Sequence, residues 1–312
     1  MKKILFLMFA LLAIATTAGA QGGVAINSTN FPDANFRSYV SANTIDKDKD
    51  GYLSDAEISA VTEIGVNHKK IANLKGIEFF TELTSLNCGD NYLASFNLAK
   101  NTKLTKLECY FNQLTSLDVS NNTALRYLDC SGNKLTSLDL SQNTALVELF
   151  CTNCQLNSLD LSQNTALVGL LCGFNQLESL DLSMNTALTV FYCLVNQIKS
   201  DKMQALVNSL PTVEGEEKGK FYVINTKDEN EKNVITKSQV AIAKGKNWTV
   251  YDCDFYNGNW DEYAGSDDPM GIGGVEADAL DKAAWYTLDG KKLSGEPTKK
   301  GVYIYKGRKV VK

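Results

Sequence analysis

Residues 83–187 read LTSLNCGDNYLASFNLAKNTK, LTKLECYFNQLTSLDVSNNTA, LRYLDCSGNKLTSLDLSQNTA, LVELFCTNCQLNSLDLSQNTA and LVGLLCGFNQLESLDLSMNTA. These are consecutive units of 21 residues, which begin at Leu83, Leu104, Leu125, Leu146 and Leu167. A sixth unit, LTVFYCLVNQI, begins at Leu188 and then changes character. A fixed period of this length is the signature of a solenoid, in which each unit forms one coil and stacks on the next.

Each unit is expected to hold one short strand through its fourth to sixth positions. Side chains alternate along a strand, so the fourth and sixth positions turn inward together, and neighbouring strands lie about 4.8 Å apart. Stacked cysteines at that spacing are too far apart for the Cβ atoms of a disulfide, so we expect a buried ladder of reduced thiols. The inward pairs are Leu86/Cys88, Leu107/Cys109, Leu128/Cys130, Leu149/Cys151, Leu170/Cys172 and Phe191/Cys193.

Asparagine also recurs in register. A buried amide can satisfy the backbone groups that are left where each coil turns away from the sheet. Cys154 replaces the asparagine of one coil and creates a Cys151-x-x-Cys154 motif, which we interpret as structural because both cysteines occupy ladder positions. The ninth position carries Asn91, Asn112, Asn133, Asn175 and Asn196, and the nineteenth carries Asn101, Asn122, Asn143, Asn164 and Asn185.

The unit resembles the leucine-rich-repeat family, LxxLxLxxNxL, with cysteine in place of the third leucine. The resemblance implies an α/β fold in which a right-handed solenoid carries a parallel sheet on its concave face. Segments such as Ser116–Val119 alternate with period two, so we expect an extended or 3₁₀ conformation on the convex side.

Beyond the repeats the period lengthens and helical patterns enter. Residues 201–210 and a second segment that opens with the capping box of Thr236 and Gln239 are expected to be helices. Strand-like runs at 221–224 and 248–251 would continue the parallel sheet. The sequence therefore predicts a helix-containing C-terminal cap.

Residues 46–57, DKDKDGYLSDAE, match the twelve-residue EF-hand calcium loop. Apolar spacing predicts a helix on each side, through Phe36, Tyr39 and Val40 before the loop and Ile58, Val61 and Ile64 after it. The alternative is a solvated acidic turn in which Ser54-x-x-Glu57 merely caps a helix. We predict a structural calcium ion, with Gly51 at the sharp turn and ligands from Asp46, Asp48, Asp50, Tyr52 (carbonyl), Ser54 (through water) and Glu57.

A helical, EF-hand-like cap before cysteine-laddered coils resembles the internalin group of adhesins over roughly residues 30–252. This resemblance implies that the concave face binds a host protein or a carbohydrate. The Gram-positive sorting motif of that group is absent from the sequence.

Residues beside the inward pairs should project onto the concave surface. Many are apolar or aromatic in the later coils, and Asp90, Glu108, Asp129 and Glu148 lie on the same face of the earlier ones. A contiguous exposed apolar patch marks an interaction surface, whose aromatic rings can stack on sugars or bury a partner's side chains. The alternative is that β-propensity, or packing of the chain's own tail against the sheet, explains these residues. The candidate ligand-binding residues are Tyr110, Phe111, Tyr127, Phe150, Leu171, Phe174 and Tyr192, with Leu194 and Val195 beside them.

The composition argues against catalysis and against nucleic-acid binding. His68 is the only histidine, which almost excludes histidine-dependent triads and multi-histidine zinc sites. The acidic concave positions could pair for glycoside hydrolysis, but their repetition is typical of solvated strand positions. A net charge of −5 without a basic tract does not suit phosphate recognition. We predict that the protein is not an enzyme.

Both termini point to export. Lys2 and Lys3, the apolar run of residues 4–14 and Ala18-Gly19-Ala20 form a secretory-signal pattern. No apolar run reaches the roughly 20 residues that cross a bilayer, so we expect no membrane span. At the other end, LDGKKL (288–293), KKGVYIY (299–305) and the ending KVVK resemble the C-terminal sorting domain of the Bacteroidetes type IX route, which implies surface attachment. An accessory domain of two hairpins is the alternative.

The sequence thus predicts an exported or surface-attached monomer that binds a host or bacterial surface protein or a glycan without catalysis. A secreted glycan-processing hydrolase and a structural self-association protein are the alternatives. The predicted segments are a signal peptide (1–20), the N-terminal cap (21–65), the repeats (66–198), the C-terminal cap (199–263), a linker (264–282) and a small β tail (283–312).

Overall fold

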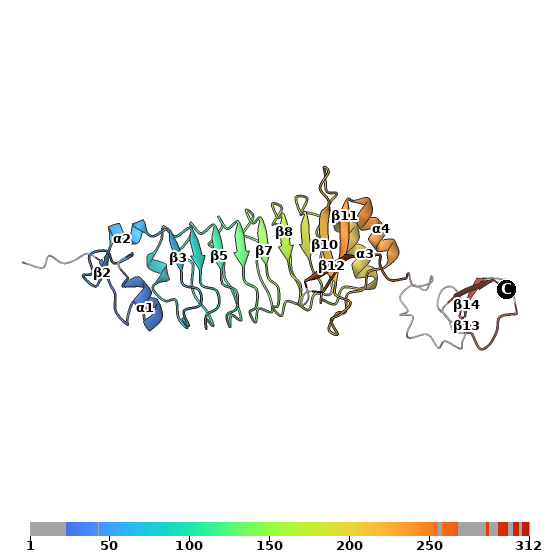
Figure 1. Ribbon diagram of the computed structural model, residues 1–312, viewed down its shortest axis with the longest axis horizontal. Coiled ribbons are helices and arrows are strands. Elements are labelled where there is room, and N and C mark those ends of the chain that lie inside the picture. Colours follow the sequence, from blue (N-terminus) through green and yellow to red (C-terminus); the bar gives the residue numbers. More distant parts are fainter. Residues whose placement is uncertain are drawn as a thin grey trace, which may run out of the picture.

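A ten-stranded sheet forms the spine of the protein in the computed structural model, which describes residues 23–42, 44–254, 258–267, 285–286, 293–298, 302–305 and 308–311. The strand order is β12-β11-β10-β9-β8-β7-β6-β5-β4-β3, and Figure 1 shows one strand for each coil. The predicted signal peptide and most of the predicted linker lie outside the described residues. The strands are β3 (Glu63–Gly65), β4 (Ser85–Asn87), β5 (Lys106–Glu108), β6 (Tyr127–Asp129), β7 (Glu148–Phe150), β8 (Gly169–Leu171), β9 (Val190–Tyr192), β10 (Gly219–Ile224), β11 (Trp248–Asp254) and β12 (Asn259–Glu262).

The register of the strands follows the repeat. Leu107 pairs with Leu128, and Leu128 pairs with Leu149, so equivalent residues of successive coils stack directly on one another. The leucine and cysteine columns are fully buried, and all eight cysteines are free thiols. The predicted reduced cysteine ladder is confirmed, since the period sets neighbouring thiols one strand spacing apart.

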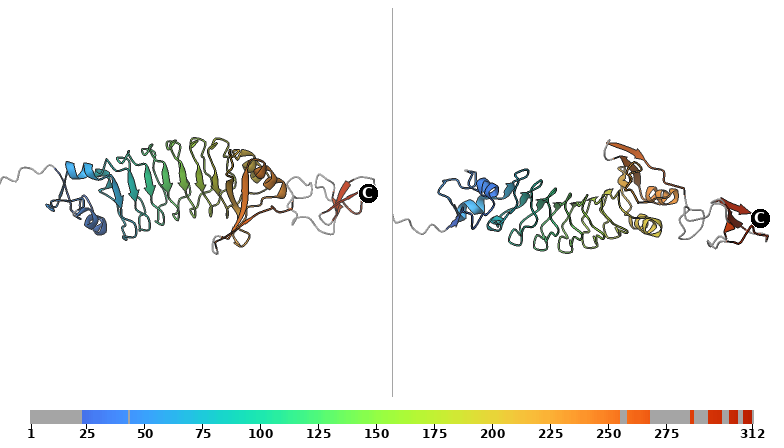
Figure 2. Two further views of the ribbon diagram at one scale, coloured as in Figure 1. Left: turned by 45° about the horizontal axis from the view of Figure 1, so that its top comes forward. Right: turned by 90° about the horizontal axis from the view of Figure 1, so that it is seen from below.

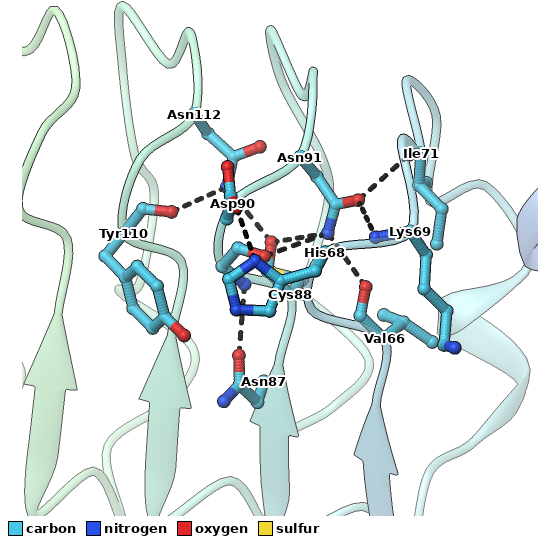
Figure 3. Close-up of polar contacts among 11 residues, drawn as sticks. Val66, His68, Lys69, Ile71, Asn87, Cys88, Asp90, Asn91, Tyr110 and Asn112 are labelled. Carbon is cyan, nitrogen blue, oxygen red and sulfur yellow. Dashed lines mark hydrogen bonds and ion pairs between the residues drawn. The ribbon is translucent and has the colours of Figure 1, made fainter.

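The ninth-position asparagines fasten each coil to the preceding one (Figure 3). The Asn91 amide donates to the carbonyl oxygens of Val66 and Cys88 at 2.8 and 3.0 Å, and its oxygen accepts from the Ile71 amide at 2.9 Å. The nineteenth-position asparagines join coils on the other side through their amide donors alone, and Asn122, for example, donates to two carbonyl oxygens while its own side-chain oxygen has no partner. A buried amide therefore pairs the backbone groups that the turns leave without strand partners.

The convex side of the repeats runs as turns and extended chain, as the short period predicts. Figure 2 shows the loops hanging from the sheet without helices until the C-terminal end. There, α3 (Ser200–Ser209) and α4 (Lys237–Gly245) cover the convex side, and both members of the Thr236–Gln239 capping box form their hydrogen bonds. Strand β12, which the sequence did not predict, runs antiparallel to β11 and ends the sheet.

The N-terminal cap comprises β1 (Gly23–Ala25), α1 (Ala34–Val40), β2 (Tyr52–Ser54) and α2 (Asp55–Ala60), and a 3₁₀ turn η1 (Ile77–Phe79) follows in the first coil. The predicted helix through Ile64 is wrong beyond Ala60. Val61 is already extended, and Ile64 is the inward residue of β3. The three-residue spacing fits a helix, but the pairing of Ile64 with Leu86 makes this segment the first strand of the parallel sheet, so the solenoid begins before residue 66.

The described part of the tail contains β13 (Trp285–Tyr286), β14 (Val302–Tyr305) and β15 (Arg308–Val311). Strands β14 and β15 pair as the predicted second hairpin. Strand β13 pairs with β14, and its Trp285 carbonyl also accepts from Leu293 N at 2.8 Å. Among the described residues, no helix has the length and apolarity needed to cross a membrane.

Candidate binding surface on the concave face

The outward residues of the strands form a column that changes character along the solenoid. At the fifth repeat position this column is polar at first, with Asn87, Glu108 and Asp129, and becomes apolar at Phe150. It continues through Leu171, Tyr192, Tyr222 and Tyr251, each paired in register with its neighbour. One face of one sheet therefore joins an acidic region to an aromatic region.

The acidic region surrounds the Tyr127 ring. Lys106 Nζ lies 2.9 Å from a Glu108 oxygen and 5.1 Å from the centre of that ring. Burial raises the pKa of Asp129, and the Glu108 charge adds to the rise, against hydrogen bonds from Ser131 that lower it. Burial and the negative charges of its neighbours raise the pKa of Tyr127 to about 12. Only one lysine is paired with this group of carboxylates among the described residues, so the region keeps a negative potential.

Two aromatic residues of the coil after β5 rest on glycines. The Tyr110 ring lies over Gly89, where an added Cβ would come within 2.4 Å of a ring carbon. The neighbouring Phe111 lies over Gly132, where a Cβ would come within 2.2 Å. Phe111 still exposes 60% of its surface, so the glycine fixes the ring without hiding it.

At the C-terminal end the aromatic rings of successive strands pack against one another along the column, and Tyr222 and Tyr251 stack face to face. The centroids of Tyr222 and Tyr251 are 4.8 Å apart with an interplanar angle of 19°, and Tyr192 lies 5.6 Å from Tyr222. Trp260 of β12 meets Tyr222 edge to face at 5.0 Å and is half exposed. The β11–β12 hairpin, which projects on the sheet side in Figure 2, thus borders this end of the concave face.

The same hairpin buries part of the predicted patch. Tyr192 is only 5% exposed, and Leu194 and Val195 are also buried, in a small cluster with Cys253 of β11. The Tyr192 hydroxyl lies 3.7 Å from the Cys253 thiol. The prediction that these three residues are exposed is wrong, because residues that follow the repeats fold back over them.

The remaining predicted residues do reach the concave surface or its rim. Tyr127 and Phe150 lie 5.2 Å apart, Leu171 follows on β8, and Phe174 packs at the edge of the Cys253 cluster. The repeat pattern does not predict that the concave surface includes Tyr222, Tyr251 and Trp260, because the 21-residue period breaks before them. Alternation along the predicted strands at 221–224 and 248–251 would have placed the two tyrosines on this face.

The only histidine lies near the start of the surface, beside the asparagine ladder (Figure 3). Its Nδ1 pairs with the Asp90 carboxylate of the next coil, and both side chains are mostly exposed. Both residues have positive φ, as do the eighth-position residues of the following coils. His68 therefore belongs to the solvated rim of the concave face.

The predicted metal residues lie far from this surface, in the N-terminal cap. Carboxylate oxygens of Asp46, Asp48 and Asp50 all lie within 4.8 Å of one another. Tyr52 and Ser54 are in β2, and Glu57 is in the first turn of α2. The Glu57 carboxylate accepts hydrogen bonds from Lys47 N and from both the amide and the hydroxyl of Ser54.

Comparison with known proteins gives several likenesses. A family model described as leucine-rich repeats (2 copies) matches residues 102–143. The functional domain of InlJ from Listeria monocytogenes, which includes a cysteine ladder, is 27% identical with a TM-score of 0.29; the match covers 66% of this chain and only 57% of that one. Internalin C2 from the same organism is 18% identical, with a TM-score of 0.51 and coverage of 69% and 96%. No curated protein sequence matches at a significant level.

A leucine-rich-repeat protein from Leptospira interrogans is 19% identical, with a TM-score of 0.52 and coverage of 62% of this chain and 49% of that one. At these identities the likenesses to internalin C2 and to the Leptospira protein show the fold alone. They agree with the family match and with the parallel sheet and buried ladders described above. The chain folds as a leucine-rich-repeat solenoid.

Proposed function

We propose that the protein is an exported, non-catalytic binding protein whose concave face takes up a protein partner. The observation that carries the proposal is the column that joins Glu108 and Asp129 to Phe150, Leu171 and Tyr222 on one face of the sheet. Aromatic side chains beside charge are typical of protein-binding surfaces, and solenoids offer their concave sheets for this purpose. The partner surface that fits best carries apolar side chains next to lysine or arginine.

Ring orientation favours a protein over a glycan. A sugar stacks on the open face of an aromatic ring. Here the faces of Tyr222 and Tyr251 cover each other, Tyr110 covers Gly89, and Phe111 covers Gly132. Each of these contacts covers one face of a ring and so reduces the ring surface on which a sugar could stack, whereas Phe111, which still exposes 60% of its surface, can be buried against the apolar side chains of a polypeptide.

Export and surface attachment rest on the sequence patterns at the two ends of the chain. The signal-like residues 1–20 would direct the chain out of the cytoplasm. The tail that resembles type IX sorting domains would then attach it at the outer surface. In that setting the solenoid would act in adhesion to a surface protein of a host or of another bacterium.

The test uses a panel of purified extracellular proteins together with a glycan array. Phe150→Ala and Tyr222→Ala should each weaken the binding of a protein hit about tenfold or more, as the loss of a central aromatic contact does. Met184→Ala is the matched control, because Met184 is exposed in the convex part of its coil, outside the strands. A protein hit that binds all variants equally would refute the concave site.

Other results of the same screen would favour the alternatives. Hits confined to glycans would contradict the choice of a protein partner. Cleavage of an array glycan that Asp129→Asn abolishes would favour a hydrolase built on Glu108 and Asp129. Concentration-dependent dimerisation that Phe150→Ala abolishes would favour self-association.

A further inference from the structure

The twelve-residue loop between α1 and α2 plays no part in the proposed function, although its backbone is built for a compact turn. Lys49 has a φ of 59° and Gly51 a φ of 84°, values in the left-handed region. This fold of the loop brings the carboxylates of Asp46, Asp48 and Asp50 together. Gathered acidic groups repel one another, so the loop holds like charges together at an energetic cost.

One of the three carboxylates is buried, and one of its oxygens lacks a hydrogen-bond partner. Asp46 exposes 3% of its surface, and its Oδ1 is buried and has no hydrogen-bond partner. A buried oxygen that carries negative charge and lacks a partner is strongly disfavoured. A cation held between the three carboxylates would satisfy this oxygen and remove the repulsion.

Glu57 ties the end of the loop to its beginning. Its Oε1 accepts from Lys47 N at 2.7 Å, and its Oε2 accepts from Ser54 N at 2.9 Å. The available donors are all oxygens, the set that suits a hard cation such as calcium.

Strand β1 holds the loop from the opposite side. Gly23, Val24 and Ala25 pair with Ser54, Leu53 and Tyr52, and Ile26 N donates to Gly51 O at 2.8 Å. Gly23 lies so close that an added Cβ would be 2.7 Å from Leu53 O. The chain next to the predicted signal peptide therefore braces the strand within the loop.

We propose that this loop binds one calcium ion through Asp46, Asp48, Asp50, Glu57, the Tyr52 carbonyl and Ser54, and that the paired β1 is part of the site. The ion neutralises the gathered carboxylates and fixes the turn at Gly51. Because β2 continues that turn, binding of the ion and pairing of β1 stabilise each other. The site is separate from the concave face, so its failure would leave the proposed function untouched.

The test is titration of the full chain, first stripped with a chelator, with CaCl₂ alone. Calorimetry should show one site per chain with a Kd in the 10⁻⁴ to 10⁻³ M range of extracellular modules. At about ten times Kd the melting temperature should rise by roughly 3–6 °C. The absence of both heat and a melting shift at 10 mM CaCl₂ would overturn the proposal.

Matched variants separate the site from general charge effects. Glu57→Gln keeps a side chain that can serve the capping box, yet it should abolish binding. Asp55→Asn removes the same charge from an exposed residue outside the three-carboxylate group and should bind calcium as the parent does. Equal binding by both variants would overturn the assignment.

The role of β1 is tested with Gly23→Val, which places a side chain against Leu53 O. It should raise the Kd for calcium about threefold or more while the far-ultraviolet circular dichroism of the solenoid stays unchanged. An unchanged Kd would overturn the coupling between β1 and the ion.

Discussion

Cys154→Asn should make the protein more stable, because Cys154 interrupts a hydrogen-bond ladder that the other coils complete. In the coils on either side, the oxygens of Asn133 and Asn175 each accept from the leucine amide of the preceding coil at 3.0 Å. Leu135, the equivalent residue opposite Cys154, is fully buried and has no carboxamide oxygen facing its amide. The Cys154 thiol makes only long contacts, 3.4 Å to Cys130 O and 3.9 Å to Thr152 O.

The expected gain can be worked from these bonds. An asparagine would give the Leu135 amide an acceptor and would replace the weak thiol contact to Cys130 O with an N–H donor, as Asn175 provides to Cys151 O at 2.9 Å. A net hydrogen bond contributes about 0.5–1.5 kcal/mol, and an unsatisfied buried donor costs about 1–3 kcal/mol. Cys154→Asn should therefore raise the free energy of unfolding by about 1–3 kcal/mol.

Urea denaturation followed by both circular dichroism and tryptophan fluorescence measures this change, since agreement of the two probes tests two-state unfolding. Asn175→Cys is the reciprocal control and should lose a similar amount. Cys154→Ala removes the thiol without supplying an amide, and it should not gain. A Cys154→Asn protein no more stable than Cys154→Ala would refute the account of the ladder.

Two further predictions concern the buried cysteines and the packing of the Phe111 ring on Gly132. Burial raises the pKa of Cys88 to about 12 and that of Cys109, Cys151, Cys172 and Cys193 well above its ordinary value, so their thiols are protonated in the fold at pH values where the unfolded chain ionises. The stability that these protonated thiols contribute is complete below about pH 9, and above it the free energy of unfolding falls by up to about 1.4 kcal/mol per pH unit for each cysteine. Urea denaturation at pH 8 and pH 10 measures this loss. Equal free energies of unfolding at the two pH values would contradict the prediction. Gly132→Ala should cost about 1–3 kcal/mol, because φ is 67° there and the new Cβ meets Phe111. Thermal melts of the double variant Gly132→Ala/Phe111→Ala should show that part of the lost stability is recovered. No recovery would mean that the Phe111 ring does not pack on Gly132.

On the concave face, the sequence predicts which residues point outward but not which of them remain exposed. Phe150 and Leu171 lie inside the repeat, so the period alone fixes their register and their outward direction. Tyr192 occupies the same repeat position, yet it is buried, because Cys253, 61 residues later in the chain, packs on it. No local pattern distinguishes an outward residue that meets solvent from one that meets a distant hairpin.

The acidic loop of residues 46–57 gives the opposite case, because its local sequence carries nearly all the information. The spacing of Asp46, Asp48, Asp50 and Glu57 places potential ligands within one short turn. Yet the pairing of that turn with residues 23–25, and the burial of Asp46, depend on chain segments outside the motif.

By itself, the sequence determined the solenoid, its buried leucine and cysteine columns and the asparagine ladders, because each contact there joins a residue to its equivalent one period away. Only the tertiary structure decided how the stack is closed, which concave residues stay exposed and what braces the acidic loop. Those contacts join segments that share no period, and their geometry depends on packing that repetition does not encode.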